Sequence, residues 1–194
     1  MACILSQHTS DANAARAHRS LLSRWPTWDD LATARAQDLA DAIRMGGLAN
    51  VKATRILDCL GEIRSREGAY SLSRLASLPD TDVDRYLRSL PGVGPKTAAI
   101  VLCFALHRDR VPVDTHVHRV AKRLGIIDLG TSAEAAHGVL DRVTPAGMAF
   151  RTHLALLRLG KSTCRARQPL CNACVAADVC PRVAVAGESH RTPR

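Results

Sequence analysis

The sequence predicts an all-α fold. Apolar residues recur at the three- and four-residue spacing of an amphipathic helix along most of the 194 residues. No stretch sustains the alternation of apolar and polar residues that a half-buried strand requires. Hydrophobic residues make up 46% of the chain and aromatic residues only 3%, so leucine, alanine, valine and isoleucine must form the core. A chain of this size can bury such a core as one domain or as two small domains.

Nine helices are expected, over residues 11–24, 38–45, 50–67, 71–77, 81–90, 95–107, 115–124, 132–143 and 147–160. Ser10-Asp11 can cap the first helix, and Trp25-Pro26 ends it because the residue before a proline disfavours helical geometry. Gly46-Gly47 ends the second helix. The third helix is amphipathic, with four apolar residues on one side: Val51, Ile56, Leu60 and Ile63.

The later helices carry their own end signals. Pro79 stops the fourth helix, and Asp82 and Asp84 place negative charge in the first turn of the fifth, where it suits the helix dipole. Pro95 can occupy the first position of the sixth helix, and Asp114 can cap the seventh. The last two helices follow from periodicity alone. The polar residues 184–194 are expected to form a frayed tail.

The charge balance indicates a nucleic-acid partner. The chain has 27 Lys and Arg against 18 Asp and Glu, a formal net charge of +9. Such an excess on a small chain is typical of proteins that bind a polyanion. No apolar run approaches the ~20 residues of a membrane span, and the N-terminus lacks a signal-peptide pattern. We therefore expect a soluble intracellular protein with no membrane partner.

The segment LPGVGPKTA, residues 90–98, joins two predicted helices through a Gly-x-Gly turn. Glycine lets the backbone approach another surface because it has no Cβ, and the N–H groups of the following helix can bind a phosphate. Gly92, Val93, Gly94 and Thr97 are therefore candidate contacts to a DNA backbone, which such a hairpin grips without reading its sequence. A tight turn without a ligand explains the same residues equally well.

Lys96 lies in the first turn of the helix that follows. Only four of the 27 basic residues are lysines, so a residue needed only for its positive charge would more often be arginine here. An amine can lose its proton and act as a nucleophile, which a guanidinium does not do. Lys96 is therefore a candidate nucleophile, and a solvated surface lysine is the alternative.

The segment VPVDTHVHRV, residues 111–120, brings a carboxylate to the start of another helix. An aspartate in this place is ordinarily an N-cap. The helix before it is about 20 Å long at 1.5 Å per residue, so an antiparallel return can bring Asp114 near Lys96. A carboxylate there can take up the proton of the amine and stabilise positive charge on a sugar.

The seven cysteines fall into two groups. Three lie among apolar residues and are expected to fill the core: Cys3, Cys59 and Cys103. The other four lie within 17 residues in the pattern C-x₆-C-x₂-C-x₅-C: Cys164, Cys171, Cys174 and Cys180. Four thiolates at this spacing can hold one metal centre, and a structural zinc and a 4Fe–4S cluster compete about equally on spacing alone.

Taken together, the two segments and the cysteines resemble the helix-hairpin-helix/Gly-Pro-Asp superfamily of DNA glycosylases, and the cysteine spacing is most similar to that of the endonuclease III family. The resemblance runs from Ile4 to about Cys180. It implies a helical-bundle domain with the helix-hairpin-helix motif over residues 10–108. It also implies a smaller iron–sulfur domain over residues 1–9 and 109–183, with a DNA cleft between the two domains. Family members carry a further helix ahead of the part matching Ile4, so the N-terminal part of the iron–sulfur domain is expected to be shortened.

The resemblance also implies a base excision repair DNA glycosylase with AP lyase activity that removes oxidised pyrimidines. Lys96 would attack the sugar C1′, expel the damaged base and form a Schiff base, and β-elimination would then nick the strand. Asp114 would be its partner carboxylate. The four cysteines would hold a 4Fe–4S cluster with a structural role. The partner would be double-stranded DNA with a damaged base or an abasic site, bound by a monomer that is cytoplasmic and associated with the nucleoid.

Base removal in this family implies that the target nucleotide is flipped out of the duplex. Leu48 matches a family position that wedges into the gap. The contact to the opposite base falls to Gln7 or His8, because relatives have a glutamine directly before the threonine, where this chain has His8. Further expected DNA contacts, including a basic finger between the first two cysteines, are Asn50, His116, Arg119, Lys161, Arg165 and Arg167.

Two other functions stay open. One is a monofunctional glycosylase of the same superfamily, such as an adenine or mismatch enzyme. Adenine-specific relatives lack the hairpin lysine and place a catalytic glutamate in their first helix. Here Lys96 is present, and residues 1–10 contain no side-chain carboxylate. The other is a non-catalytic DNA-binding module held together by an iron–sulfur cluster or zinc.

Overall fold

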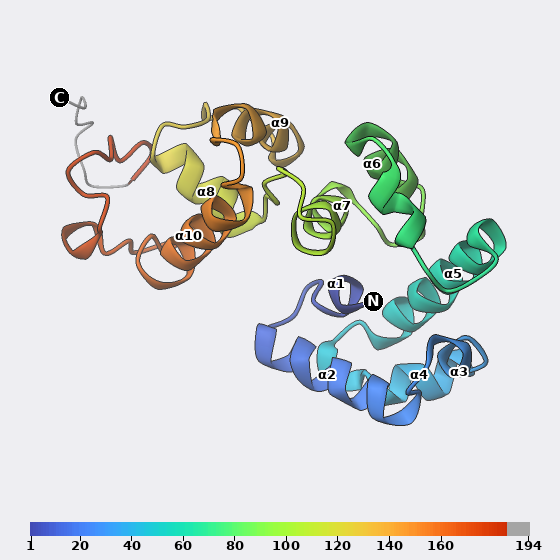
Figure 1. Ribbon diagram of the computed structural model, residues 1–194. Coiled ribbons are helices and arrows are strands. Elements are labelled where there is room, and N and C mark those ends of the chain that lie inside the picture. Colours follow the sequence, from blue (N-terminus) through green and yellow to red (C-terminus); the bar gives the residue numbers. More distant parts are fainter. Residues whose placement is uncertain (186–194) are drawn as a thin grey trace. The chain divides into compact units, whose positions relative to one another are not determined.

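The computed structural model describes residues 1–185, and within them all regular secondary structure is helical (Figure 1), which confirms the all-α prediction. The α-helices are α1 (Ala2–Leu5), α2 (Asp11–Arg24), α3 (Trp28–Ala32), α4 (Ala36–Ala42), α5 (Ala49–Glu67), α6 (Asp80–Arg88), α7 (Pro95–Ile100), α8 (Thr115–Arg123), α9 (Ala133–Val143) and α10 (Ala149–Ser162). Three 3₁₀ turns, η1 (Arg44–Gly46), η2 (Ser73–Ser77) and η4 (Cys171–Ala173), and a π-helical turn, η3 (Val101–Ala105), complete the set. None of the helices described is long and apolar enough to cross a membrane.

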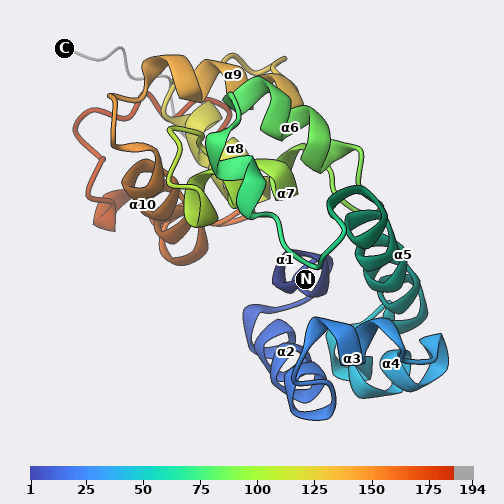
Figure 2. The same cartoon turned by 45° about the vertical axis from the view of Figure 1, so that its right-hand side comes forward.

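Contacts divide the chain into two compact units, Met1–Ala98 and Ala99–Arg194. Within the first unit α4 packs along α5, and α2 lies beside them, as Figures 1 and 2 both show. The sequence prediction assigns residues 1–9 to the iron–sulfur domain, whereas α1 contacts α2 and α5 of the first unit. The predicted domain boundaries themselves stay a prediction.

The buried face of α5 differs from the predicted one. Ile56, Leu60 and Ile63 are buried as expected, but Val51 is 46% exposed and Lys52 takes its place in the core with 1% exposure. Residues 52, 56, 60 and 63 follow the three- and four-residue spacing of one helix face, whereas residue 51 lies five positions before 56 and points elsewhere. The sequence prediction therefore placed the start of the buried face one residue too early, because residue 51 is apolar and residue 52 is charged.

Most helix ends lie where the sequence signals place them. The Ser10 hydroxyl accepts a hydrogen bond from the Asn13 amide and begins α2, which ends at Arg24 before Trp25-Pro26. Gly68 ends α5 with a left-handed φ of 71°. The prediction missed α3, which Thr27 and Asp30 start with a capping box.

The single helix predicted over residues 95–107 is interrupted. α7 ends at Ile100, and η3 continues as a π-helical turn in which the Leu106 amide donates to the Val101 carbonyl at 3.1 Å. The extra residue in each hydrogen-bonded ring changes the direction of the chain before it runs to Val111.

The second unit is built on the packing of α8 against α10. Its core consists mainly of small and branched side chains: Cys103, Val111, Val113, Val117, Val120, Ala121, Ile127, Ala136, Leu140, Ala149 and Leu156. A Cβ at Gly160 would lie 2.8 Å from the Cβ of His116, so this contact between α8 and α10 requires glycine. Of the predicted tail, Val185 is buried, and residues 186–194 lie outside the described part of the chain.

Candidate active site and cysteine pocket

The predicted hairpin connects α6 to α7 in the first unit. The Val93 amide donates to the Leu90 carbonyl at 3.1 Å, and the Ala98 amide donates to the Gly94 carbonyl at 3.0 Å to close the first turn of α7. Gly92 has a φ of 76°, and a Cβ there would meet the side chain of Arg55 at 3.0 Å. Both the backbone conformation and the close approach of Arg55 therefore require glycine.

Lys96 is exposed in the first turn of α7, as a nucleophile that must reach a substrate requires. The neighbouring Thr97 is buried, so its side chain belongs to the core. The two side chains give the turn one outward amine and one inward anchor.

Two loops of the first unit carry the predicted wedge residues. The Gln7 side-chain amide donates to the Gly92 carbonyl at 3.0 Å and accepts from Arg55 at 3.3 Å, which ties the loop after α1 to the hairpin. His8 and Leu48 are exposed and have left-handed φ values of 51° and 50°. Asn50 is exposed in the first turn of α5. Gln7 thus lies against the hairpin while His8 projects outward.

Asp114 is the N-cap of α8 in the second unit. Its Oδ1 accepts hydrogen bonds from the His116 amide at 2.9 Å and the Val117 amide at 2.8 Å. These bonds fix the carboxylate relative to the helix axis, and α8 adds the positive end of its dipole. Lys96 and Asp114 belong to different units, and their meeting at one site stays a prediction.

The extended segment that leads to Asp114 is held by three side chains. Asp141 Oδ1 accepts from the Val111 amide at 2.7 Å, His137 Nδ1 lies 3.0 Å from the Val111 carbonyl oxygen, and His153 Nδ1 lies 2.8 Å from that of Pro112. No motif in the sequence marks these residues, because they are distant along the chain and meet only after folding.

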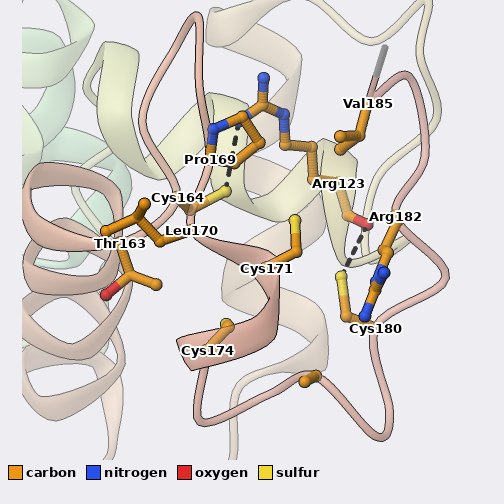
Figure 3. A pocket seen from close by; sticks show the side chains of 11 residues that line it. Arg123, Thr163, Cys164, Pro169, Leu170, Cys171, Cys174, Cys180, Arg182 and Val185 are labelled. Atoms are coloured by element: carbon orange, nitrogen blue, oxygen red, sulfur yellow. Dashed lines mark hydrogen bonds between the residues drawn. The ribbon is translucent and has the colours of Figure 1, made fainter. Parts of the chain in front are cut away.

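The four clustered cysteines line one pocket (Figure 3). All four are partly buried and outside any disulfide, on a segment that runs from the end of α10 through η4. No three His, Cys, Asp or Glu side chains among residues 1–185 are grouped as around one metal ion. In a 4Fe–4S cluster each thiolate binds a different iron, so its ligands surround a volume, whereas four zinc ligands converge on one point. Four thiols around a shared pocket fit the cluster.

Arg123, in the last turn of α8, ties the cysteine segment to the rest of the second unit. Its guanidinium donates to the carbonyls of Arg165 at 2.6 Å and Ala166 at 2.9 Å and to Cys164 Sγ at 3.4 Å. Its carbonyl accepts from Cys180 Sγ at 3.3 Å, and Figure 3 shows both sulfur contacts. One arginine thus contacts the first and the last of the four cysteines.

The other predicted DNA contacts of the second unit divide into inward and outward side chains. Arg119 donates to the carbonyls of Gly160 at 2.8 Å and Cys164 at 3.1 Å, and it lies 3.2 Å from Nδ1 of the half-buried His116. The remaining three are exposed: Lys161, Arg165 and Arg167. Arg119 is therefore engaged within the unit, while the exposed three form an outward basic group.

The protein-family comparison matches residues 1–145 to the family described as HhH-GPD superfamily base excision DNA repair protein. The chain belongs to this superfamily. One relative, endonuclease III from Thermotoga maritima, is 32% identical over 177 residues, which are 91% of this chain and 78% of that protein. The match to the endonuclease III family predicted from the motifs is confirmed.

Two further HhH-GPD comparisons define the extent of the likeness. A candidate DNA glycosylase from Arabidopsis thaliana is 37% identical over 183 residues, and this chain spans 62% of its length. The solved structure of a trapped covalent intermediate between endonuclease III and DNA is 28% identical with a TM-score of 0.81, covering 93% of this chain and 81% of that one. The endonuclease III fold therefore extends over nearly the whole of this chain.

Proposed function

We propose that this HhH-GPD protein is a DNA glycosylase with AP lyase activity that acts on oxidised pyrimidines in duplex DNA. The observation that carries the proposal is the exposed amine of Lys96, held in the first turn of α7 directly after the glycine hairpin. The relatives named endonuclease III support the class of reaction. We further propose that the protein works as a monomer on nucleoid DNA in the cytoplasm.

Lys96 supplies the nucleophile in this proposal. Its unprotonated Nζ attacks C1′ of the damaged nucleotide, and the bond from C1′ to the base breaks with its electron pair leaving on the base, which takes up a proton. Ring opening of the sugar then gives an imine between Nζ and C1′. Loss of a C2′ proton expels the 3′ phosphate, so the strand is nicked by β-elimination.

Asp114 supplies the carboxylate. Its Oδ1 is bound by two amides of α8, so the group is oriented before substrate arrives. We assign it the uptake of the Lys96 proton and the stabilisation of positive charge on the sugar as the base departs. The segment fixed by Asp141, His137 and His153 holds this carboxylate in place.

The DNA contacts follow the exposed residues. Leu48 and either Gln7 or His8 would fill the space left by the flipped nucleotide. Asn50 and the hairpin residues Gly92, Val93 and Gly94 would contact the backbone, and Thr97 would contribute through its amide. In the second unit the exposed basic group would bind phosphate, while His116 and Arg119 would act mainly by shaping the surface, since both face α10.

Cys164, Cys171, Cys174 and Cys180 would hold a 4Fe–4S cluster. When bound, it would supply four iron–thiolate bonds that cross-link a segment with little core of its own. Its role in this proposal is structural.

Borohydride trapping on a duplex with an abasic site tests the function. The wild-type chain should give a covalent protein–DNA adduct, and Lys96→Ala should give none, because the proposal assigns the imine to the Lys96 amine. Lys122→Ala, which removes a half-buried lysine of α8 outside the hairpin, is the matched control and should keep the adduct. Base release without an adduct would identify a monofunctional glycosylase, and binding without either would identify a non-catalytic module.

A further inference from the structure

Lys52 is a charged side chain in the core of the first unit. It is 1% exposed, and its Nζ donates to the carbonyls of Leu5 and Gly46, both at 2.8 Å. Burial lowers the pKa of this amine because the charged form loses its hydration. Since removing a charge from water is unfavourable, an ammonium held by two backbone carbonyls calls for a reason beyond packing.

The two carbonyls belong to two different loops. Leu5 ends α1 just before Gln7 and His8, and Gly46 lies two residues before Leu48. The loops adjoin, because a Cβ at Gly47 would lie 4.0 Å from the carbonyl oxygen of His8. The Nζ of Lys52 therefore links two neighbouring loops through one backbone carbonyl of each.

Each loop presents an exposed residue in a strained conformation. His8 and Leu48 both have left-handed φ values, and Leu48 is 55% exposed although it is apolar. Non-glycine residues keep this conformation only where the surrounding structure fixes it, which is common at ligand-binding positions. The amide of Lys52 also donates to the Leu48 carbonyl at 2.9 Å. The backbone and the side chain of one residue thus constrain both loop tips.

We propose that Lys52 is a positioning residue that fixes the spacing of the Gln7-His8 loop and the Leu48 loop, so that both tips enter the DNA together. The proposal rests on the proposed function, because it assigns these loops to the gap left by a flipped nucleotide. Lys52 itself does not contact the DNA.

The test measures loop entry without chemistry. The probe is a duplex that carries a tetrahydrofuran abasic analogue opposite 2-aminopurine, whose fluorescence rises when the base is unstacked. Lys52→Met keeps the length of the side chain and removes its donors. We expect the variant to bind the duplex within a few-fold of wild type but to lose most of the fluorescence rise, because the two loop tips are no longer held at a fixed spacing.

Two controls separate positioning from stability. Ile63→Ala removes a buried side chain at the far end of α5 and should lower the melting temperature without changing the fluorescence rise. Leu48→Ala should reproduce the loss, and the double variant with Lys52→Met should lose no more than the larger single effect, because both act on the same step. A wild-type rise in Lys52→Met, or additive losses, would overturn the proposal.

A second variant keeps the lysine and moves the loop. A Cβ at Gly46 would meet the Cβ of Ala17 at 3.3 Å, so Gly46→Ala should shift the carbonyl that Lys52 binds and reduce the fluorescence rise. Gly61→Ala, in an open position of α5, is the matched control and should leave it unchanged. Equal fluorescence rises for Gly46→Ala and Gly61→Ala would contradict the positioning role of Lys52. Loss of trapping in the wild type would count against the proposed lyase alone, because the fluorescence does not depend on the reaction.

Discussion

The two units hold their candidate functional residues by different means. In Met1–Ala98, Lys96 lies in the first turn of α7 and Leu48 directly precedes α5, and both helices carry buried apolar side chains. In the second unit, polar contacts fix the segment before Asp114, and no residue from Cys164 to Cys180 is buried. The segment from Cys164 to Cys180 therefore lacks an apolar core, and it is held by hydrogen bonds from Arg123 and by the four thiols around their shared pocket.

The largest expected effect separates the two roles of Asp114. Asp114→Asn keeps an oxygen that can accept from the His116 and Val117 amides, and asparagine is as good an N-cap as aspartate. We expect single-turnover cleavage of an abasic duplex to fall by about a hundredfold or more, because the proton acceptor is lost. DNA binding and the melting temperature should stay near wild type. Unchanged single-turnover rates would remove Asp114 from the reaction.

The next effect tests whether the four thiols take the place of an apolar core in the segment from Cys164 to Cys180. Cys174→Ser removes one proposed cluster ligand and should lower the iron content. It should also raise the rate of tryptic cleavage after Arg165 and Arg167 by about tenfold through local unfolding. The first unit should keep its protease resistance. Cys3→Ser, a cysteine outside the pocket, is the control, and equal cleavage rates in the two variants would show that the segment folds without a cluster.

The smallest effect concerns an ion pair in the first unit. Two hydrogen bonds from Arg74, at 2.8 and 2.9 Å, hold the pKa of Glu67 at about 2. Because this pKa lies below the ordinary value of 4.5, the pair stabilises the fold above about pH 4.5 and loses its effect as the pH falls toward 2. Glu67→Gln should therefore reduce the decline of the melting temperature between pH 5 and pH 2. Arg74→Gln should act in the same way, and an unchanged decline in both variants would contradict the assignment.

Local signals predicted most of the fold. Ser10, Trp25-Pro26 and Asp114 placed helix ends because capping and proline geometry act over a few residues. The same kind of signal was present for α3 in the capping box of Thr27 and Asp30. The prediction missed it because Trp25-Pro26, directly before it, was used only as the end of the preceding helix.

The site was predictable only as far as its motifs are local. Lys96, Asp114 and the four cysteines stand in recognisable segments, whereas Asp141, His153 and Lys52 gain their roles from contacts with backbone carbonyls or amides distant along the chain. Lys52 is the clearest case. A lysine beside an apolar valine on an amphipathic helix indicates a solvated position, and only the packing of α1 over α5 reverses that reading.

The left-handed leucine at position 48 has a consequence for evolution in the laboratory. A residue with a Cβ in this conformation costs about 1 kcal/mol, and glycine in its place would relieve that strain. Selection for heat tolerance alone would therefore favour loss of the Leu48 side chain, and with it the wedge that we propose. Screens for more thermostable variants of this protein therefore need an activity readout at every round, because replacing Leu48 by glycine would raise the thermal stability and remove the side chain that we propose enters the DNA.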